Sequence, residues 1–183
     1  SEIMKNDLTE GRMAFEKQLD IMCAGAFSVS NDSDLKWVYF LDGLKDGDNN
    51  IAALIRCNDM LRQTFADSEH YQNYSVIMKN ELIFRKSGMV VGDKFFYDNY
   101  CTYQNTDFET WRKQSFESNT WQLFPLEEID TGERTFQAMT FSYPVRNYIQ
   151  QEQEANAVVQ FLLSKENLEQ MFGQLLSRQG GIL

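Results

Sequence analysis

Two apolar segments near the C-terminal end of the chain have the pattern of neighbouring β-strands. Residues 135–145 alternate between apolar or β-branched and other side chains with a period of two, whereas residues 157–164 form an almost unbroken apolar run. The first pattern predicts a strand with one buried face, and the second predicts a central strand. Ser164 is a suitable N-cap residue, so we expect a helix from Lys165 to Leu176 directly after the second strand.

The N-terminal residues have a helical period instead. The apolar positions of this segment recur at steps of three and four and predict one long helix ending near Ala26: Met4, Leu8, Phe15, Leu19, Met22 and Ala26. Gly11 interrupts the helix at some cost in stability. The apolar stripe has to pack either on the sheet of its own domain or on a second copy of the chain, and the sequence leaves both options open.

Shorter patterns fill the middle of the chain. A second helix is expected from about residue 32 to residue 43, and a third follows, capped by Asp48 or Asn49, with one apolar face: Ile51, Leu54, Ile55, Leu61 and Phe65. Strands are expected at 74–78, 82–84, 95–97 and 121–124, the last one ended by Pro125.

A fourth helix is predicted after these first strands. The sequence Thr106-Asp-Phe-Glu109 matches a capping box, and the helix it opens places Phe108, Trp111 and Ser115 on one face. Asp130-Thr-Gly132 predicts a tight turn into the strand at 135–145. The predicted order is therefore three helices, three strands, one helix, three strands and a final helix.

Charge and composition exclude several functions. The net charge is -10, from 17 Lys and Arg against 27 Asp and Glu, so direct contact with nucleic acid is not expected. No apolar run reaches the roughly 18 residues of a membrane span. The 3 cysteines are widely spaced and there is 1 histidine, so neither a disulfide framework nor a zinc site is indicated. We expect no metal and no cofactor, because no phosphate-binding glycine loop is present either.

Enzymatic chemistry also finds little support. His70 has Ser68 and Glu69 beside it but no Gly-x-Ser-x-Gly motif accompanies them. The acidic pairs Glu127-Glu128 and Glu152/Glu154 lie in polar sequence, where a carboxyl pKa is not raised as glycoside hydrolysis requires. The chain is therefore predicted not to be an enzyme.

The sequence resembles the extracytoplasmic Cache sensor domains, which are PAS-like modules of bacterial membrane receptors. The resemblance rests on the N-terminal helix, residues 82–91, the helix around Trp111, Phe141-Ser-Tyr-Pro-Val145 and residues 158–168. It implies an α+β fold, in which a PAS-like antiparallel sheet is combined with a long N-terminal helix and an outgoing C-terminal helix. Within this family, the chain looks most like the sensors of Firmicute-type AraC transcription regulators and of related histidine kinases.

The resemblance also implies an organisation and a location. Residues 1–30 would form a helix next to the membrane, 31–164 the Cache lobe, and 165–183 a helix leading to a second lobe or to the membrane. The domain would lie outside the cell, in a membrane-anchored signalling protein, and would respond to a small polar ligand or, instead, to contact with a protein. The expected parent protein is an AraC-type transcription regulator, and the alternative within the same class is a two-component histidine kinase. The alternative from another class is a surface binding domain without a signalling role. Pairing of two copies through the N-terminal helix is expected of such receptors.

Candidate ligand-binding residues follow from the same resemblance. Amino-acid-binding Cache domains hold their ligand with a Tyr, Arg, Trp and Asp motif, and the order and spacing from Tyr100 to Arg112 depart from it. The residues still offer a pocket with Trp111 and Trp121 as apolar walls, Arg112 as a bidentate donor, and the hydroxyl of Tyr143 at the mouth. Tyr100 is a further candidate ligand-binding residue. The alternative reading is that both tryptophans are core residues and Arg112 is solvated.

Overall fold

The computed structural model describes residues 2–39, 47–66, 73–146 and 154–173, with side chains from residue 50 onward in the second range. The elements follow one another along the chain as α1 (Glu2–Ser30), α2 (Ser33–Val38), α3 (Gly47–Phe65), β1 (Tyr74–Met78), β2 (Leu82–Arg85), β3 (Gly88–Val91), α4 (Asp93–Tyr100), β4 (Thr102–Tyr103), α5 (Phe108–Glu117), β5 (Gln122–Asp130), β6 (Thr135–Val145), β7 (Ala157–Ser164) and α6 (Lys165–Phe172). The expected helical N-terminal part and strand-rich C-terminal part are confirmed.

The strands within the described ranges form one seven-stranded sheet in the order β3-β2-β1-β7-β6-β5-β4, and their pairs are all antiparallel. The apolar strand β7 lies at its centre, between β1 and β6. This placement explains its sequence, because a strand covered on both faces needs apolar side chains in both directions. The predicted α+β fold with a PAS-like antiparallel sheet is confirmed.

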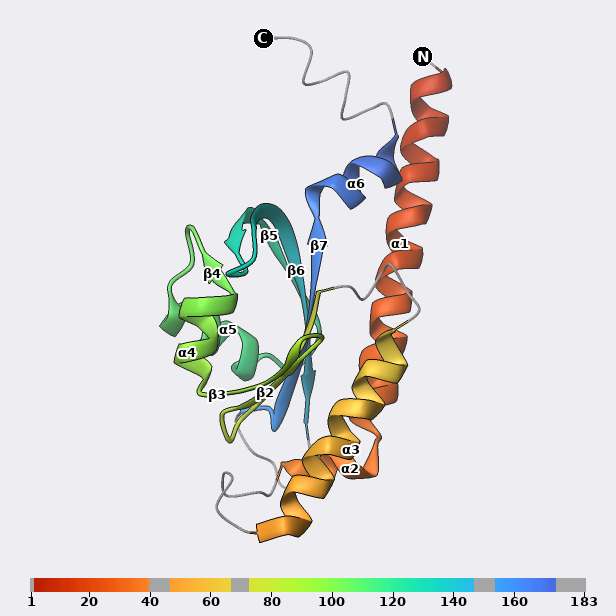
Figure 1. Ribbon diagram of the computed structural model, residues 1–183. Helices are drawn as coiled ribbons and strands as arrows, with labels where there is room; N and C mark the ends of the chain where they lie inside the picture. The colour runs from red at the N-terminus through yellow and green to blue at the C-terminus, as the bar shows by residue number, and fades with distance from the viewer. Residues whose placement is uncertain (1, 40–46, 67–72, 147–153, 174–183) are drawn as a thin grey trace.

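Helices cover both faces of the sheet (Figure 1). Helices α1, α2 and α3 pack on one face, which we call the helix-layer face, and α4 and α5 lie against the other, which we call the cavity face. Phe141 and Phe161 are buried on the helix-layer face, and Trp111 and Val158 on the cavity face. Each face therefore has its own hydrophobic core. No helix in the described ranges combines the length and apolar character needed to cross a lipid bilayer.

Helix α1 is longer than its contact with the sheet. Met22 and Ala26 are fully buried, whereas the side chains of Met4 and Leu8 are 51% and 58% exposed. The C-terminal part of the predicted stripe therefore belongs to the intramolecular core, and only its N-terminal part remains as a candidate dimer face. Helix α6 lies beside the N-terminal half of α1 (Figure 1). Phe172 of α6 packs so closely against Gly11 that a methyl group at position 11 would lie 2.4 Å from the phenylalanine ring.

One predicted strand is wrong. Residues 95–97 lie within helix α4, although three successive aromatic residues have high β-propensity. Gly92 enables the change of direction, because its backbone has φ 95, a conformation that residues other than glycine rarely adopt. In the helix, Phe96 and Tyr97 are buried against the cavity face. Tertiary packing thus outweighs the local strand preference.

Two predicted boundaries between Thr106 and Pro125 also need correction. Asp107, rather than Thr106, caps α5, and its carboxylate accepts from the backbone N–H of Thr110 at 2.8 Å. The Thr106 hydroxyl instead donates to Glu127 at 2.8 Å. Strand β5 does not end at Pro125 but continues to Asp130, with its register to β6 shifted between Phe124 and Glu127. A bulge accommodates the proline, which has no N–H for the ladder.

The boundaries of two helices differ from the prediction as well. Helix α3 begins at Gly47, so Asp48 and Asn49 lie inside it rather than capping it. Leu54, Leu61 and Phe65 of its predicted face are buried, but Ile51 and Ile55 are 53% and 56% exposed. Helix α6 is capped by Ser164 as predicted, with the serine hydroxyl 3.2 Å from the Asn167 N–H, and it ends at Phe172.

Candidate functional site

A polar cavity of about 620 Å³ lies on the cavity face of the sheet. Its walls come from β1, β2 and β7, from the end of α4, and from the turn between β5 and β6. The residues that matter for its chemistry are Asn73, Ser75, Arg85, Tyr100, Cys101, Glu133, Arg134 and Gln160. Side chains from five segments that are distant in sequence thus meet in one place, which requires the complete fold.

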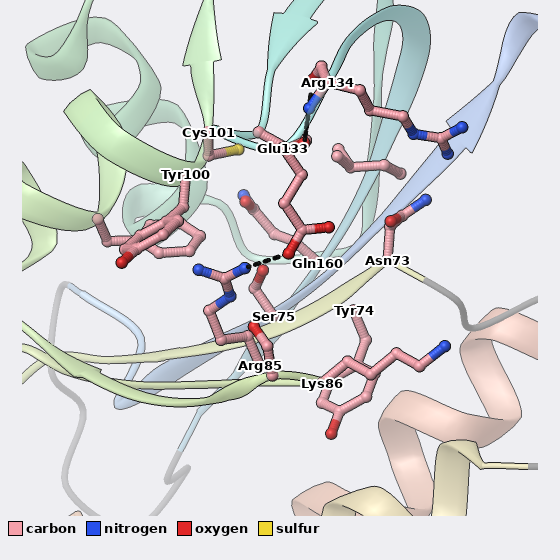
Figure 2. Close-up of a pocket in the computed structure, with 14 residues that line it drawn as sticks. Asn73, Tyr74, Ser75, Arg85, Lys86, Tyr100, Cys101, Glu133, Arg134 and Gln160 are labelled. Atoms are coloured by element: carbon pink, nitrogen blue, oxygen red, sulfur yellow. Dashed lines mark hydrogen bonds and ion pairs between the residues drawn. The ribbon is translucent and has the colours of Figure 1, made fainter.

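Arg85 is the central charged group of this cavity. Its guanidinium carbon lies 3.9 Å from the centre of the Tyr100 ring, and one terminal nitrogen lies 3.8 Å from a carboxylate oxygen of Glu133. Figure 2 shows the guanidinium and the Glu133 carboxylate turned toward each other beside the tyrosine ring. The Arg85 side chain is only 16% exposed, whereas that of Glu133 is 77% exposed. A largely buried cation therefore faces a loosely held anion at the entrance.

Gln160 forms the polar floor of the cavity and is itself held by three side chains. Its amide oxygen accepts from the indole N–H of Trp111 at 3.3 Å, and its amide nitrogen donates to Ser115 at 2.8 Å and to Ser142 at 3.2 Å. Because Gln160 is 3% exposed, these bonds satisfy a group that would be costly to bury without partners. The network connects α5, β6 and β7 directly beneath the cavity.

The turn after β5 is fixed against α4. The carboxylate of Asp130 accepts from the N–H of Gly132 at 2.8 Å, and the Thr131 N–H donates to the carbonyl of Arg134 at 3.0 Å. Gly132 has φ +77, and a side chain there would lie 2.3 Å from the carbonyl oxygen of Asn99. Close packing of this turn on the end of α4 explains the glycine, and it holds Glu133 at the cavity entrance.

The ionisable groups deepest in the cavity face are neutral. Burial raises the pKa of the Cys101 thiol to about 12 and also raises the pKa of the Tyr103 hydroxyl. The Tyr103 hydroxyl is in addition within 2.8 Å of the hydroxyl of Thr140. Cys101 therefore stays a protonated thiol at physiological pH and is unsuited to nucleophilic chemistry.

The structure brings three of the five predicted site residues to the cavity face. Tyr100 lines the cavity, and Trp111 is completely buried behind Gln160. Arg112 lies outside the cavity, where its guanidinium binds Asp93 at 2.7 Å and Glu154 at 3.5 Å. Although partial burial opposes the charge, these carboxylates hold the pKa of Arg112 above its ordinary value. Arg112 is thus occupied in joining α4, α5 and the segment before β7.

The other two predicted residues lie on the opposite face of the sheet. Trp121 stacks on Phe141 with 5.5 Å between ring centres, and Tyr143 packs against the same helix-layer core. These two residues therefore do not meet Tyr100 in one pocket. The sequence reasoning overlooked Arg85 and Gln160, although both carry a signal: each is a polar residue at the end of, or inside, an otherwise apolar strand.

The residues considered for catalysis are not assembled into a site in the described part of the chain. Glu127 accepts from the N–H of Asn105 and from Thr106, and Glu154 pairs with Arg112. His70, Ser68, Glu69 and Glu152 lie outside the described residues. Among the described residues, no three His, Cys, Asp or Glu side chains are grouped as metal ligands would be.

Comparison with known proteins gives structural matches. No family model and no curated protein sequence matches the chain. The periplasmic sensory domain of the Campylobacter jejuni chemoreceptor Tlp1 superposes with a TM-score of 0.54 at 11% identity, over 98% of this chain and 63% of that one. The periplasmic domain of Vibrio cholerae LuxQ superposes with a TM-score of 0.52 at 8% identity, over 91% of this chain and 70% of that one. The fold is that of bacterial periplasmic sensory domains. This chain spans less than two thirds of the Tlp1 domain.

Proposed function

We propose that this chain is the ligand-sensing domain of a membrane-anchored bacterial receptor, and that it lies outside the cytoplasmic membrane. The fold similarity to two periplasmic domains supports the location, and the polar cavity around Arg85 is the observation that carries the sensing role. The ligand is a small polar molecule bound between the sheet and α4. A chemoreceptor or a histidine kinase is favoured as the parent protein over the expected AraC-type regulator, because the two matches described above are the sensory domain of a chemoreceptor and the periplasmic domain of LuxQ.

The path of the signal follows from the connection between cavity and helices. Gln160 at the cavity floor and the start of α6 belong to one continuous segment, since β7 runs directly into α6. Helix α6 packs on α1, with the rings of Phe15 and Phe172 6.2 Å apart. A ligand that displaces β7 therefore shifts α6 against α1, at the end of the domain where α1 begins. This arrangement favours signalling over a passive surface binding domain. The division into a membrane-side helix (1–30), a lobe (31–164) and an outgoing segment (165–183) remains part of the proposal.

The proposed ligand site is tested by thermal unfolding of the chain with amino acids, small carboxylates and hexoses at millimolar concentration. A ligand at 100 times its Kd stabilises the native state by about 2.7 kcal/mol, so a true ligand gives a concentration-dependent rise in Tm. The Ser75→Phe variant places a ring in the cavity and is expected to lose this rise. The Gln137→Phe variant, in which the ring is on an exposed position of β6, is expected to keep it. A rise that survives in Ser75→Phe, or none with any compound, contradicts the proposal.

We also propose that two copies pair through the N-terminal part of α1. Met4 and Leu8 continue the helix face that packs inside the domain farther along, yet they are more than half exposed. Sedimentation equilibrium is expected to show weak dimerisation that Leu8→Glu abolishes. Met13→Glu introduces the same charge at a residue 63% exposed on another side of the helix, and it is expected to leave the dimer intact. If Leu8→Glu and Met13→Glu change dimerisation to the same extent, the dimer contact does not lie on the helix face that carries Leu8.

A further inference from the structure

The cavity is electropositive within an acidic protein. Among the residues that the structure describes, three cationic residues line it, Arg85, Lys86 and Arg134, against one carboxylate, Glu133. The whole chain carries a net charge of -10. In Figure 2, Lys86 and Arg134 extend away from Arg85, so they contribute to the potential at the rim rather than to one contact point. Such a local reversal of sign attracts small anions to a surface that otherwise repels them.

Arg85 has binding capacity that the protein does not use. Within the described part of the chain, its guanidinium has only the tyrosine ring and the 3.8 Å ion pair as partners, and that separation is too long for a hydrogen bond. A guanidinium has five N–H donors in a planar fork that matches a carboxylate. The Tyr100 ring covers one face of this plane by a cation–π contact and leaves the donor edge available.

Glu133 occupies the position that an anionic ligand would compete for. Its side chain is 77% exposed and belongs to a turn that Gly132 fixes on α4, so the carboxylate stays near the guanidinium without being tightly bound. The 3.8 Å separation and the exposure of the Glu133 carboxylate to water both make this ion pair weak. Replacing Glu133 by a ligand carboxylate that makes two direct hydrogen bonds is therefore favourable.

We propose that the cavity binds a small organic carboxylate, with the carboxylate on the donor edge of Arg85, the Tyr100 ring supporting the guanidinium, and Glu133 as an internal competitor that the ligand displaces. This inference rests on the proposed sensing function and gives the ligand its chemical class. The remainder of the ligand meets Ser75 and Asn73, because both N–H donors of Gln160 are already engaged. A neutral or cationic molecule of the same size lacks the group that Arg85 recognises.

Calorimetric titration with succinate, lactate and citrate, and with succinamide and lactamide as neutral counterparts, tests the ligand class. At least one acid is expected to bind while its amide does not. Arg85→Lys keeps the charge but not the fork, and is expected to weaken binding by about 10- to 100-fold. Tyr100→Leu weakens it as well, whereas Glu133→Gln strengthens it by about two- to fivefold. Arg12→Gln removes a cation from the exposed surface of α1, with 75% of its side chain accessible, and is expected to have no effect.

The outcomes separate this inference from the proposed function. If amides or sugars bind wild type as well as acids do, and Ser75→Phe abolishes that binding, the cavity is a sensor site but the carboxylate class is wrong. Acid binding that is unchanged in Arg85→Lys, in a variant with a wild-type unfolding transition, overturns the role of Arg85. If Glu133→Gln binds the acid more weakly than wild type, instead of more tightly, Glu133 is not a competitor of the ligand. If no compound of the wider panel binds, the proposed function fails together with the inference.

Discussion

Replacing Trp111 by alanine is expected to destabilise the domain by about 3–5 kcal/mol, because removing a fully buried aromatic side chain leaves a cavity. Trp111 is 0% exposed and is surrounded by three rings, with centres 5.5 Å away in Tyr97, 6.0 Å in Phe108 and 6.1 Å in Phe96. The change also takes away the indole N–H that Gln160 accepts from. For a chain of this length, the loss corresponds to a fall in Tm of roughly 6–20 °C in a thermal melt.

Trp121 provides the matched control for this prediction. It is also a tryptophan next to a phenylalanine, but its side chain is 40% exposed and it stacks on Phe141 at the edge of the helix layer. Trp121→Ala is expected to cost about 1 kcal/mol, near the centre of the distribution for point substitutions, because a large part of the ring is already in contact with water. If the two variants melt at the same temperature, Trp111 is not the centre of the core on the cavity face.

Periodicity predicted those elements whose side chains repeat over many residues. Helix α1 and the strands β6 and β7 have long, regular patterns, and all three lie where the sequence placed them. The short helix α4 was missed because its eight residues contain a run of aromatics that fits a strand as well. What decides between the two structures is the packing of Phe96 and Tyr97 against β-strands elsewhere in the chain, and that information is not local.

The candidate site illustrates the same limit. The family resemblance led to the prediction of Arg112 as a bidentate donor to the ligand, yet its guanidinium faces Asp93 and Glu154, which come from other parts of the chain. Arg85 was overlooked because its neighbours in sequence, Phe84 and Lys86, give no sign that Tyr100 and Glu133 approach it in the fold. Residue type indicated that a guanidinium and aromatic rings are available for binding. Which of them share a cavity depends on the strand order of the sheet.

Replacing each of two buried glutamines by leucine is expected to change the free energy of unfolding in opposite directions. Gln160→Leu removes three hydrogen bonds and leaves Trp111, Ser115 and Ser142 without those partners, so we expect a loss of about 3 kcal/mol or more in the free energy of unfolding. Gln18 on α1 is 1% exposed, but neither polar atom of its amide has a hydrogen-bond partner among the described residues. Gln18→Leu is therefore expected to stabilise the domain by about 1–2 kcal/mol, because an apolar side chain of similar size avoids the cost of an unpaired buried amide.

Urea unfolding followed by tryptophan fluorescence measures both changes on one scale, and an unchanged m-value ensures that they are effects on stability. A destabilising Gln18→Leu would show that its amide has partners, such as bound water, that offset its burial.

The Gln18 substitution also bears on signalling. Gln18 lies on the face of α1 that carries Gly11, against which Phe172 of α6 packs, so an unpaired amide there lowers the cost of moving α1 relative to its neighbours. If that mobility carries the signal, Gln18→Leu reduces the output of the full-length receptor while leaving ligand affinity in the cavity unchanged.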